Sequence, residues 1–147
     1  MNIMLIEREG RKPSVPKYQT KGSAGMDLEA FLTEDMVIKA GGRAKVPTGI
    51  AIELESADFA GFVMGRSSLG SKYGICPANG VGLIDSDYRG EIFVTLQNNG
   101  DEDFVIRDKD RIAQLVIVNV KQVTLTVCES LSDTERGSGG FGSTGIK

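Results

Sequence analysis

The chain has 147 residues, of which 40% are hydrophobic and 25% charged, a composition typical of a single globular domain with a sizeable core. Its formal net charge of −3 argues against a sequence-independent nucleic-acid binder, which usually carries a basic stripe, but it is compatible with a local positive pocket. The absence of histidine excludes His-based acid–base chemistry and His-ligated zinc or copper.

The first residues and the cysteines bear on where the protein works. The opening segment MNIMLIEREGRK has an apolar run too short for a signal peptide, and no stretch approaches the roughly 20 apolar residues of a membrane span. Cys76 and Cys128 lie in no metal-ligand spacing, which favours free thiols in a reducing compartment over a disulfide. We expect an intracellular, cytoplasmic protein without a membrane partner, and a nuclear or viral host-cell setting is compatible with the same features.

Short segments rich in Val, Ile, Thr and Phe, several of them alternating, predict β-strands. In chain order they are DMVIKA (35–40), VPTGIAIELE (46–55), FAGFVMG (59–65), GEIFVTLQN (90–98), DFVIRD (103–108), RIAQLVIVNV (111–120) and VTLTVCE (123–129). One or two helical turns are expected at 67–74 only, with Ser67 or Ser68 as N-cap. Many short strands separated by turn signals predict an all-β sandwich, barrel or jelly roll.

The predicted β domain covers residues 1–130, and residues 131–147 lose strand character. The glycine-rich RGSGGFGSTG (136–145) resembles a phosphate loop, but no room remains after it for the helix that normally follows such a loop. We therefore expect a flexible C-terminal arm, which is either a leftover or a segment that acts elsewhere.

Polar segments between the strands have both a functional and a structural interpretation. In GLIDSDYRGEI (82–92) two strands would flank a turn as a β-hairpin, and Tyr88 would offer a ring for stacking; the alternative is a solvated Asp-rich turn. GRSSLG (65–70) offers an arginine and serine hydroxyls to a phosphate, or is simply a capped turn with a surface arginine. Asp27, in SAGMDLEA (23–30), is uninformative alone.

Taken together, these segments resemble the trimeric all-β dUTPase family. Five motifs follow the family's order, which are AGMDL (24–28), GRSSLG (65–70), GLIDSDYRGEI (82–92), RIAQLVI (111–117) and RGSGGFGSTG (136–145). Two departures are small: Gly65 stands where many members have proline, and Ser68 where many have glycine. The resemblance implies a distorted jelly-roll or β-sandwich-like barrel, and a homotrimer with shared active sites.

The resemblance also implies a reaction, the Mg²⁺-dependent hydrolysis of dUTP to dUMP and pyrophosphate by water attack on the α-phosphorus. This activity limits uracil incorporation into DNA and supplies dUMP for dTMP synthesis. Asp85 matches the family's general base, and Asp27 matches the acid that supports the metal–water network. Mg²⁺ would be held mainly by substrate phosphates, without a direct protein ligand. Gln114 resembles a residue that orients phosphate or water, while Arg111 is either functional or structural.

The remaining site residues implied by the resemblance bind the substrate. Tyr88 matches the ring that packs under the deoxyribose and excludes a 2′-hydroxyl. Asn79 and the backbone of Gly82, Leu83 and Ile84 would hold the uracil edge. The phosphates would contact Arg66, Ser67 and Ser68. The arm would close as a lid over a site built by two other subunits, with Phe141 on the uracil and the γ-phosphate held by Arg136, Gly142, Ser143 and Thr144.

Three rival interpretations remain at this point. The related dCTP deaminase shares the fold and the nucleotide, but it needs a carboxylate at the pyrimidine C4. A regulatory trimer with weak hydrolysis is a different class, although Asp85, Tyr88, Arg136 and Phe141 are intact. A structural β-sandwich with a disordered tail leaves the five ordered motifs unexplained.

Overall fold

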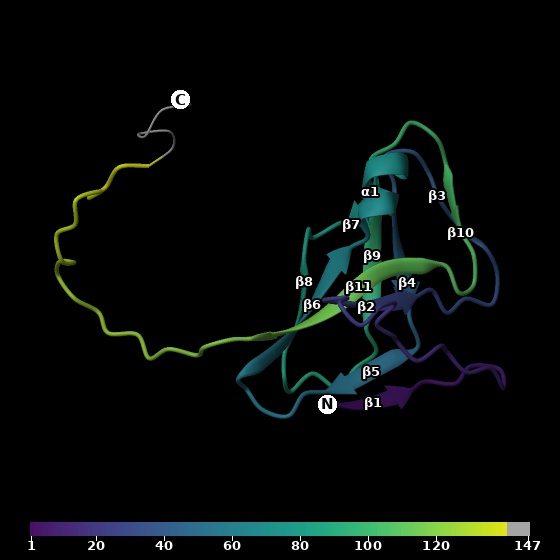
Figure 1. Cartoon of the computed structure of the whole chain (residues 1–147). Coiled ribbons are helices and arrows are strands. Elements are labelled where there is room, and N and C mark those ends of the chain that lie inside the picture. Colours follow the sequence, from purple (N-terminus) through teal and green to yellow (C-terminus); the bar gives the residue numbers. More distant parts are fainter. Residues whose placement is uncertain (141–147) are drawn as a thin grey trace.

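The structure is a computed structural model that describes residues 1–140 (Figure 1). It confirms the predicted all-β fold, because the described residues form strands with one short helix. The elements are β1 (Asn2–Leu5), β2 (Met26–Glu29), β3 (Met36–Ile38), β4 (Arg43–Pro47), β5 (Ile50–Glu53), β6 (Phe59–Gly65), α1 (Ser67–Tyr73), β7 (Ile75–Pro77), β8 (Gly82–Ile84), β9 (Phe93–Asn98), β10 (Phe104–Ile106) and β11 (Arg111–Asn119).

The strands form two larger sheets, ordered β2–β11–β6–β8 and β4–β9–β7, and two pairs, β1–β5 and β10–β3. Every pairing is antiparallel. The long strand β11 lies between β2 and β6, so that Gln114 is opposite Asp27 on one side and Met64 on the other. The sheet thus brings two of the predicted site residues next to each other.

Both larger sheets contribute to one apolar core. Leu28 and Leu115 come from the four-stranded sheet, Val46 and Leu96 come from the three-stranded sheet, and each is at most 1% exposed. Along β9 the burial alternates, with Val94, Leu96 and Asn98 buried. Burial of this apolar surface holds the two sheets together and fixes which side chains of each strand face outward.

Three predicted elements differ from the structure. The strand predicted over 46–55 is split into β4 and β5, because Gly49 has a left-handed φ of 69°. The helix at 67–74 is confirmed, but Arg66 is its N-cap and makes no side-chain cap, so the prediction of a serine cap is wrong. The strand predicted at 123–129 is absent, and Val127 there is 99% exposed, because no strand among residues 1–140 lies beside this segment to pair with it.

The chain leaves the sheets after Val120, whose N–H donates to the carbonyl of Asp58 at 2.8 Å, and then runs away from them (Figure 1). Val123 and Leu125 are 62% and 87% exposed along this path. Within residues 1–140, no helix is long and apolar enough to cross a membrane.

Gly49 is expected to be intolerant of a side chain. Its φ is 69°, and a Cβ there would lie 2.7 Å from Cδ1 of Phe31 and 2.7 Å from Cβ of Pro13. We expect Gly49→Ala to lower the free energy of unfolding by about 3 kcal/mol, from left-handed strain and overpacking together. Gly41 is the matched control, with a φ of 70° and nothing within 4 Å of its Cβ position, so that Gly41→Ala should cost about 1 kcal/mol. Urea unfolding at one protein concentration measures both, and equal losses would contradict the steric argument.

Candidate active site

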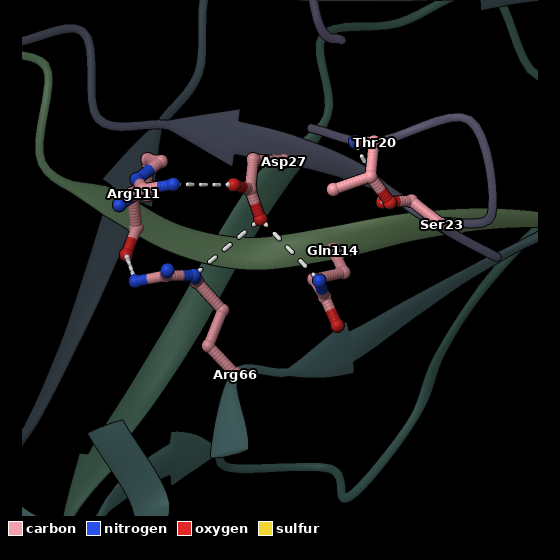
Figure 2. Close-up of polar contacts among 6 residues, drawn as sticks. All are labelled: Thr20, Ser23, Asp27, Arg66, Arg111 and Gln114. Carbon is pink, nitrogen blue, oxygen red and sulfur yellow. Dashed lines mark hydrogen bonds and ion pairs between the residues drawn. The ribbon is translucent and has the colours of Figure 1, made fainter. Parts of the chain in front are cut away.

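Asp27, on β2, lies at the centre of a polar group on the four-stranded sheet (Figure 2). Its side chain is 4% exposed, and its Oδ2 accepts a hydrogen bond from Nη1 of Arg111 at 3.1 Å. Its Oδ1 lies 3.4 Å from Nε of Arg66 and accepts a hydrogen bond from Nε2 of Gln114 at 3.4 Å. A buried carboxylate requires such partners, and in return it holds two guanidinium groups in place.

The two arginines give this group a net positive charge. Nη1 of Arg66 also donates to the carbonyl oxygen of Arg111 at 3.1 Å, which ties the end of β6 to the start of β11. The Arg111 side chain is 45% exposed, so its guanidinium group remains accessible to an anion from solvent. Ser67 and Ser68 follow Arg66 as the first residues of α1. Two guanidinium groups against one carboxylate can bind a phosphate.

The strands β8 and β9 were predicted to pair as a hairpin, and this prediction is wrong. β8 pairs with β6, while β9 pairs with β4 and β7, because the two strands belong to different sheets. They diverge, and a cavity of about 450 Å³ is lined by residues of both. The predicted base-binding residues Asn79, Gly82, Leu83 and Ile84 all line this cavity.

A second cavity of about 220 Å³ shares Leu83, Ile84 and Phe93 with the first. Asp85 and Tyr88 line this second cavity. The Tyr88 side chain is held by its hydroxyl, which donates to the carbonyl oxygen of Glu91 at 2.9 Å. The ring lies against Gly90, where a Cβ would be 2.6 Å from Cζ of Tyr88. An exposed carboxylate and an oriented ring therefore lie beside the cavity between the two strands.

The predicted phosphate-binding and base-binding residues form two separate groups in one chain. The cavities beside Asp85 and Tyr88 are lined by none of Asp27, Arg66 and Gln114. The described part of the chain after Val120 runs away from the sheets (Figure 1). Within it, Nε of Arg136 donates to the carbonyl of Gly139 at 2.9 Å. The predicted residues Phe141, Gly142, Ser143 and Thr144 lie outside the described residues.

Two cationic residues at the cavities were not found from the sequence. Arg43 lines the larger cavity and Lys45 the smaller one, both from the outer face of β4. Nζ of Lys45 lies 4.1 Å from the ring centroid of Phe93. The alternation of residues along the strand predicts that Arg43 and Lys45 lie on the same face of it. It does not predict which strands or cavities lie next to that face.

Comparison with known proteins decides the family, since a family model described as dUTPase matches residues 11–145. The chain belongs to the dUTPase family. It is 51% identical over 139 residues to the deoxyuridine 5′-triphosphate nucleotidohydrolase of Desulfitobacterium hafniense, covering 95% of this chain and 92% of that protein. The recognition based on the five motifs is thereby confirmed.

Two solved structures of dUTPases share the fold. The Staphylococcus bacteriophage 80alpha dUTPase with dUPNHPP gives a TM-score of 0.87 at 25% identity, over 99% of this chain and 98% of that one. A mutant dUTPase from phage phi11 of S. aureus, described with a structural Mg(II) ion, gives a TM-score of 0.78 at 21% identity, over 90% and 98% of the two chains. The jelly-roll-like β fold expected of the dUTPase family is confirmed by these likenesses.

Proposed function

We propose that this protein hydrolyses dUTP to dUMP and pyrophosphate, an activity that limits uracil incorporation into DNA and supplies dUMP for dTMP synthesis. Membership of the dUTPase family supports the activity. The observation that carries it in the structure is the divergence of β8 and β9, which leaves a cavity between them beside Asp85 and Tyr88.

Asp85 is the general base of the proposed reaction. Its exposed carboxylate accepts a proton from water, the water oxygen bonds to the α-phosphorus, and the bond to the bridging oxygen breaks. The electron pair of that bond leaves with pyrophosphate. The chain has no histidine that could take the proton instead.

The cavity between β8 and β9 selects the base and the sugar. Backbone N–H and C=O groups of Gly82, Leu83 and Ile84, with the amide of Asn79, face the uracil edge. Cytosine presents a hydrogen-bond donor where uracil presents an acceptor. An arrangement of backbone donors and acceptors that matches uracil therefore binds cytosine more weakly. The ring of Tyr88 packs under the deoxyribose, where a 2′-hydroxyl would collide with it.

The Asp27 group receives the phosphates. Arg66, Ser67, Ser68 and Gln114 supply donors, and Asp27 keeps the two guanidinium groups oriented. Mg²⁺ prefers oxygen ligands, but both oxygens of Asp27 already contact nitrogen donors, which supports a metal held by the triphosphate, with Asp27 acting through water. When bound, Mg²⁺ neutralises the charge of the triphosphate.

A complete site requires more than one copy of the chain. In one copy the phosphate-binding and base-binding groups do not share a cavity, and the described part of the chain after Val120 runs away from the sheets (Figure 1). We therefore place the site between subunits of a homotrimer, with the arm at 131–147 closing over it. We also place the protein in the cytoplasm, because Cys76 and Cys128 are free thiols.

The test is pyrophosphate release from dUTP, dCTP, dTTP and UTP at equal concentrations, with and without Mg²⁺. We expect release from dUTP at least about 100-fold faster than from the other three nucleotides, and faster with the metal. Ammonia release from dCTP would favour a deaminase instead. No release from any nucleotide would refute the proposal.

A further inference from the structure

A tight turn near the N-terminus, Arg8–Arg11, carries two arginines that form ion pairs with different parts of the chain. Arg8 and Arg11 exchange backbone hydrogen bonds, at 3.0 and 2.9 Å, and the central residues Glu9 and Gly10 have φ values of 51° and 72°. Positive φ at both central positions is the feature of a type I′ turn. The two arginines lie over the ring of Phe31, at 5.5 and 5.6 Å from its centroid. We call Arg8–Arg11 the arginine turn.

Arg8 connects the arginine turn to Glu91. Its Nη2 donates to Oε2 of Glu91, and Oε1 of Glu91 accepts from the backbone N–H of Gly49 at 2.7 Å. The Glu91 side chain is only 9% exposed, so both of its oxygens are engaged in a protected environment. Such a carboxylate has little freedom to move, and neither does the backbone that carries it.

Glu91 in turn carries the contact that orients Tyr88. The hydroxyl of Tyr88 donates to the backbone carbonyl of Glu91 at 2.9 Å, and the ring lies against Gly90. The next residue, Ile92, is held on both sides: its N–H donates to the carbonyl of Ile50 at 2.7 Å, and its carbonyl accepts from Oγ1 of Thr48 at 2.7 Å. The position of the Tyr88 ring therefore depends on the backbone at 90–92.

Arg11, in the same turn, makes an ion pair with Asp108, in a different part of the chain from Glu91. Its Nη2 donates to Oδ2 of Asp108, and its Nη1 donates to the carbonyl of Leu32 at 2.7 Å. Asp108 accepts from the N–H of Leu32 at 2.9 Å, and this ion pair makes no contact with Glu91 or Tyr88. Arg11 shares the turn, the aromatic ring and the kind of partner with Arg8, so it is a matched control for their effect on stability.

We propose that Arg8 and Glu91 are positioning residues for the Tyr88 ring, and that they thereby set how strictly the site rejects a ribonucleotide. The proposal rests on the proposed function, because it takes Tyr88 as the residue under the sugar. A ring held against Gly90 leaves no space for a 2′-hydroxyl. A ring that can shift by a fraction of an ångström admits that hydroxyl, because steric exclusion falls off steeply with distance.

The experiment compares Arg8→Ala and Glu91→Ala with Arg11→Ala in the full chain. For each variant, kcat/KM is measured with dUTP and with UTP, and UTP is also measured as an inhibitor of dUTP hydrolysis. We expect the dUTP/UTP ratio of kcat/KM to fall about tenfold in the Arg8 and Glu91 variants, and to stay unchanged in Arg11→Ala. Glu91→Gln keeps a carbonyl oxygen for the Gly49 N–H, but it turns an amide NH2 group towards the Arg8 guanidinium, so the ratio should fall about as far as in Arg8→Ala.

Amide hydrogen exchange over residues 85–92 provides a readout that does not depend on catalysis. We expect faster exchange there in Arg8→Ala and Glu91→Ala than in Arg11→Ala. An unchanged dUTP/UTP ratio, or an equal fall in all three variants, would overturn the proposal. Wild-type protein that releases no pyrophosphate from dUTP would instead refute the proposed function, and the exchange rates would then decide whether Arg8 and Glu91 position this segment.

Discussion

Asp85→Asn is expected to bind dUTP nearly as well as the wild-type protein and to turn it over about 1,000-fold more slowly. The amide has the shape of the carboxylate, so the cavity that Asp85 lines with Tyr88 is preserved. It cannot accept a proton from water, however, and the chain has no histidine to replace it. Pyrophosphate release gives kcat, and titration with an α,β-imido analogue of dUTP gives Kd.

The same turn offers a control for Asp85. Asp87 is a second exposed carboxylate two residues further on, but it does not line the cavity that contains Asp85 and Tyr88. Asp87→Asn should lower kcat by less than about tenfold, because it changes only the charge near the site. Turnover of Asp85→Asn close to that of the wild-type protein would remove Asp85 as the general base.

The strands were predictable where burial follows a local pattern. β6 occupies the predicted segment 59–65, and β11 ends one residue before the predicted 120, because both segments are long and rich in β-branched and aromatic residues. The divergence of β8 and β9 was not predictable in this way. A short turn between two apolar runs favours a hairpin locally, whereas the choice of sheet is made by partners such as Val63, opposite Gly82.

The candidate site residues could each be proposed from the sequence, because each motif is a continuous stretch of sequence. The contacts between motifs were not predictable. Asp27 and Arg111 lie 84 positions apart, and only the β2–β11 pairing brings them into hydrogen-bonding distance. Arg8 and Glu91 lie 83 positions apart and belong to no local pattern, so the link from the arginine turn to Tyr88 could be found only from the structure.

Truncation after Glu135 is expected to leave a folded protein whose kcat/KM for dUTP is about 100- to 1,000-fold lower. In one chain, the hydrogen bonds of the described residues 136–140 stay within the terminal segment and do not reach the sheets: Nε of Arg136 donates to the carbonyl of Gly139 at 2.9 Å, and the N–H of Gly137 donates to Oγ1 of Thr134 at 3.0 Å. Its removal therefore exposes no core. In the proposed site, the loss arises because Arg136 no longer stabilises the triphosphate and the arm no longer excludes water.

A shorter truncation separates the lid from a general effect of chain length. Removal of Ile146 and Lys147 alone keeps the whole RGSGGFGSTG motif and should leave kcat/KM unchanged. Within the full chain, Phe141→Ala should mainly raise KM if its ring stacks on uracil, as the family resemblance implies, whereas Arg136→Ala should mainly lower kcat. Circular dichroism and sedimentation show whether the protein truncated after Glu135 is folded and trimeric. An unfolded product would mean that residues 136–147 belong to the core of the assembly, and full activity would mean that the site closes without them.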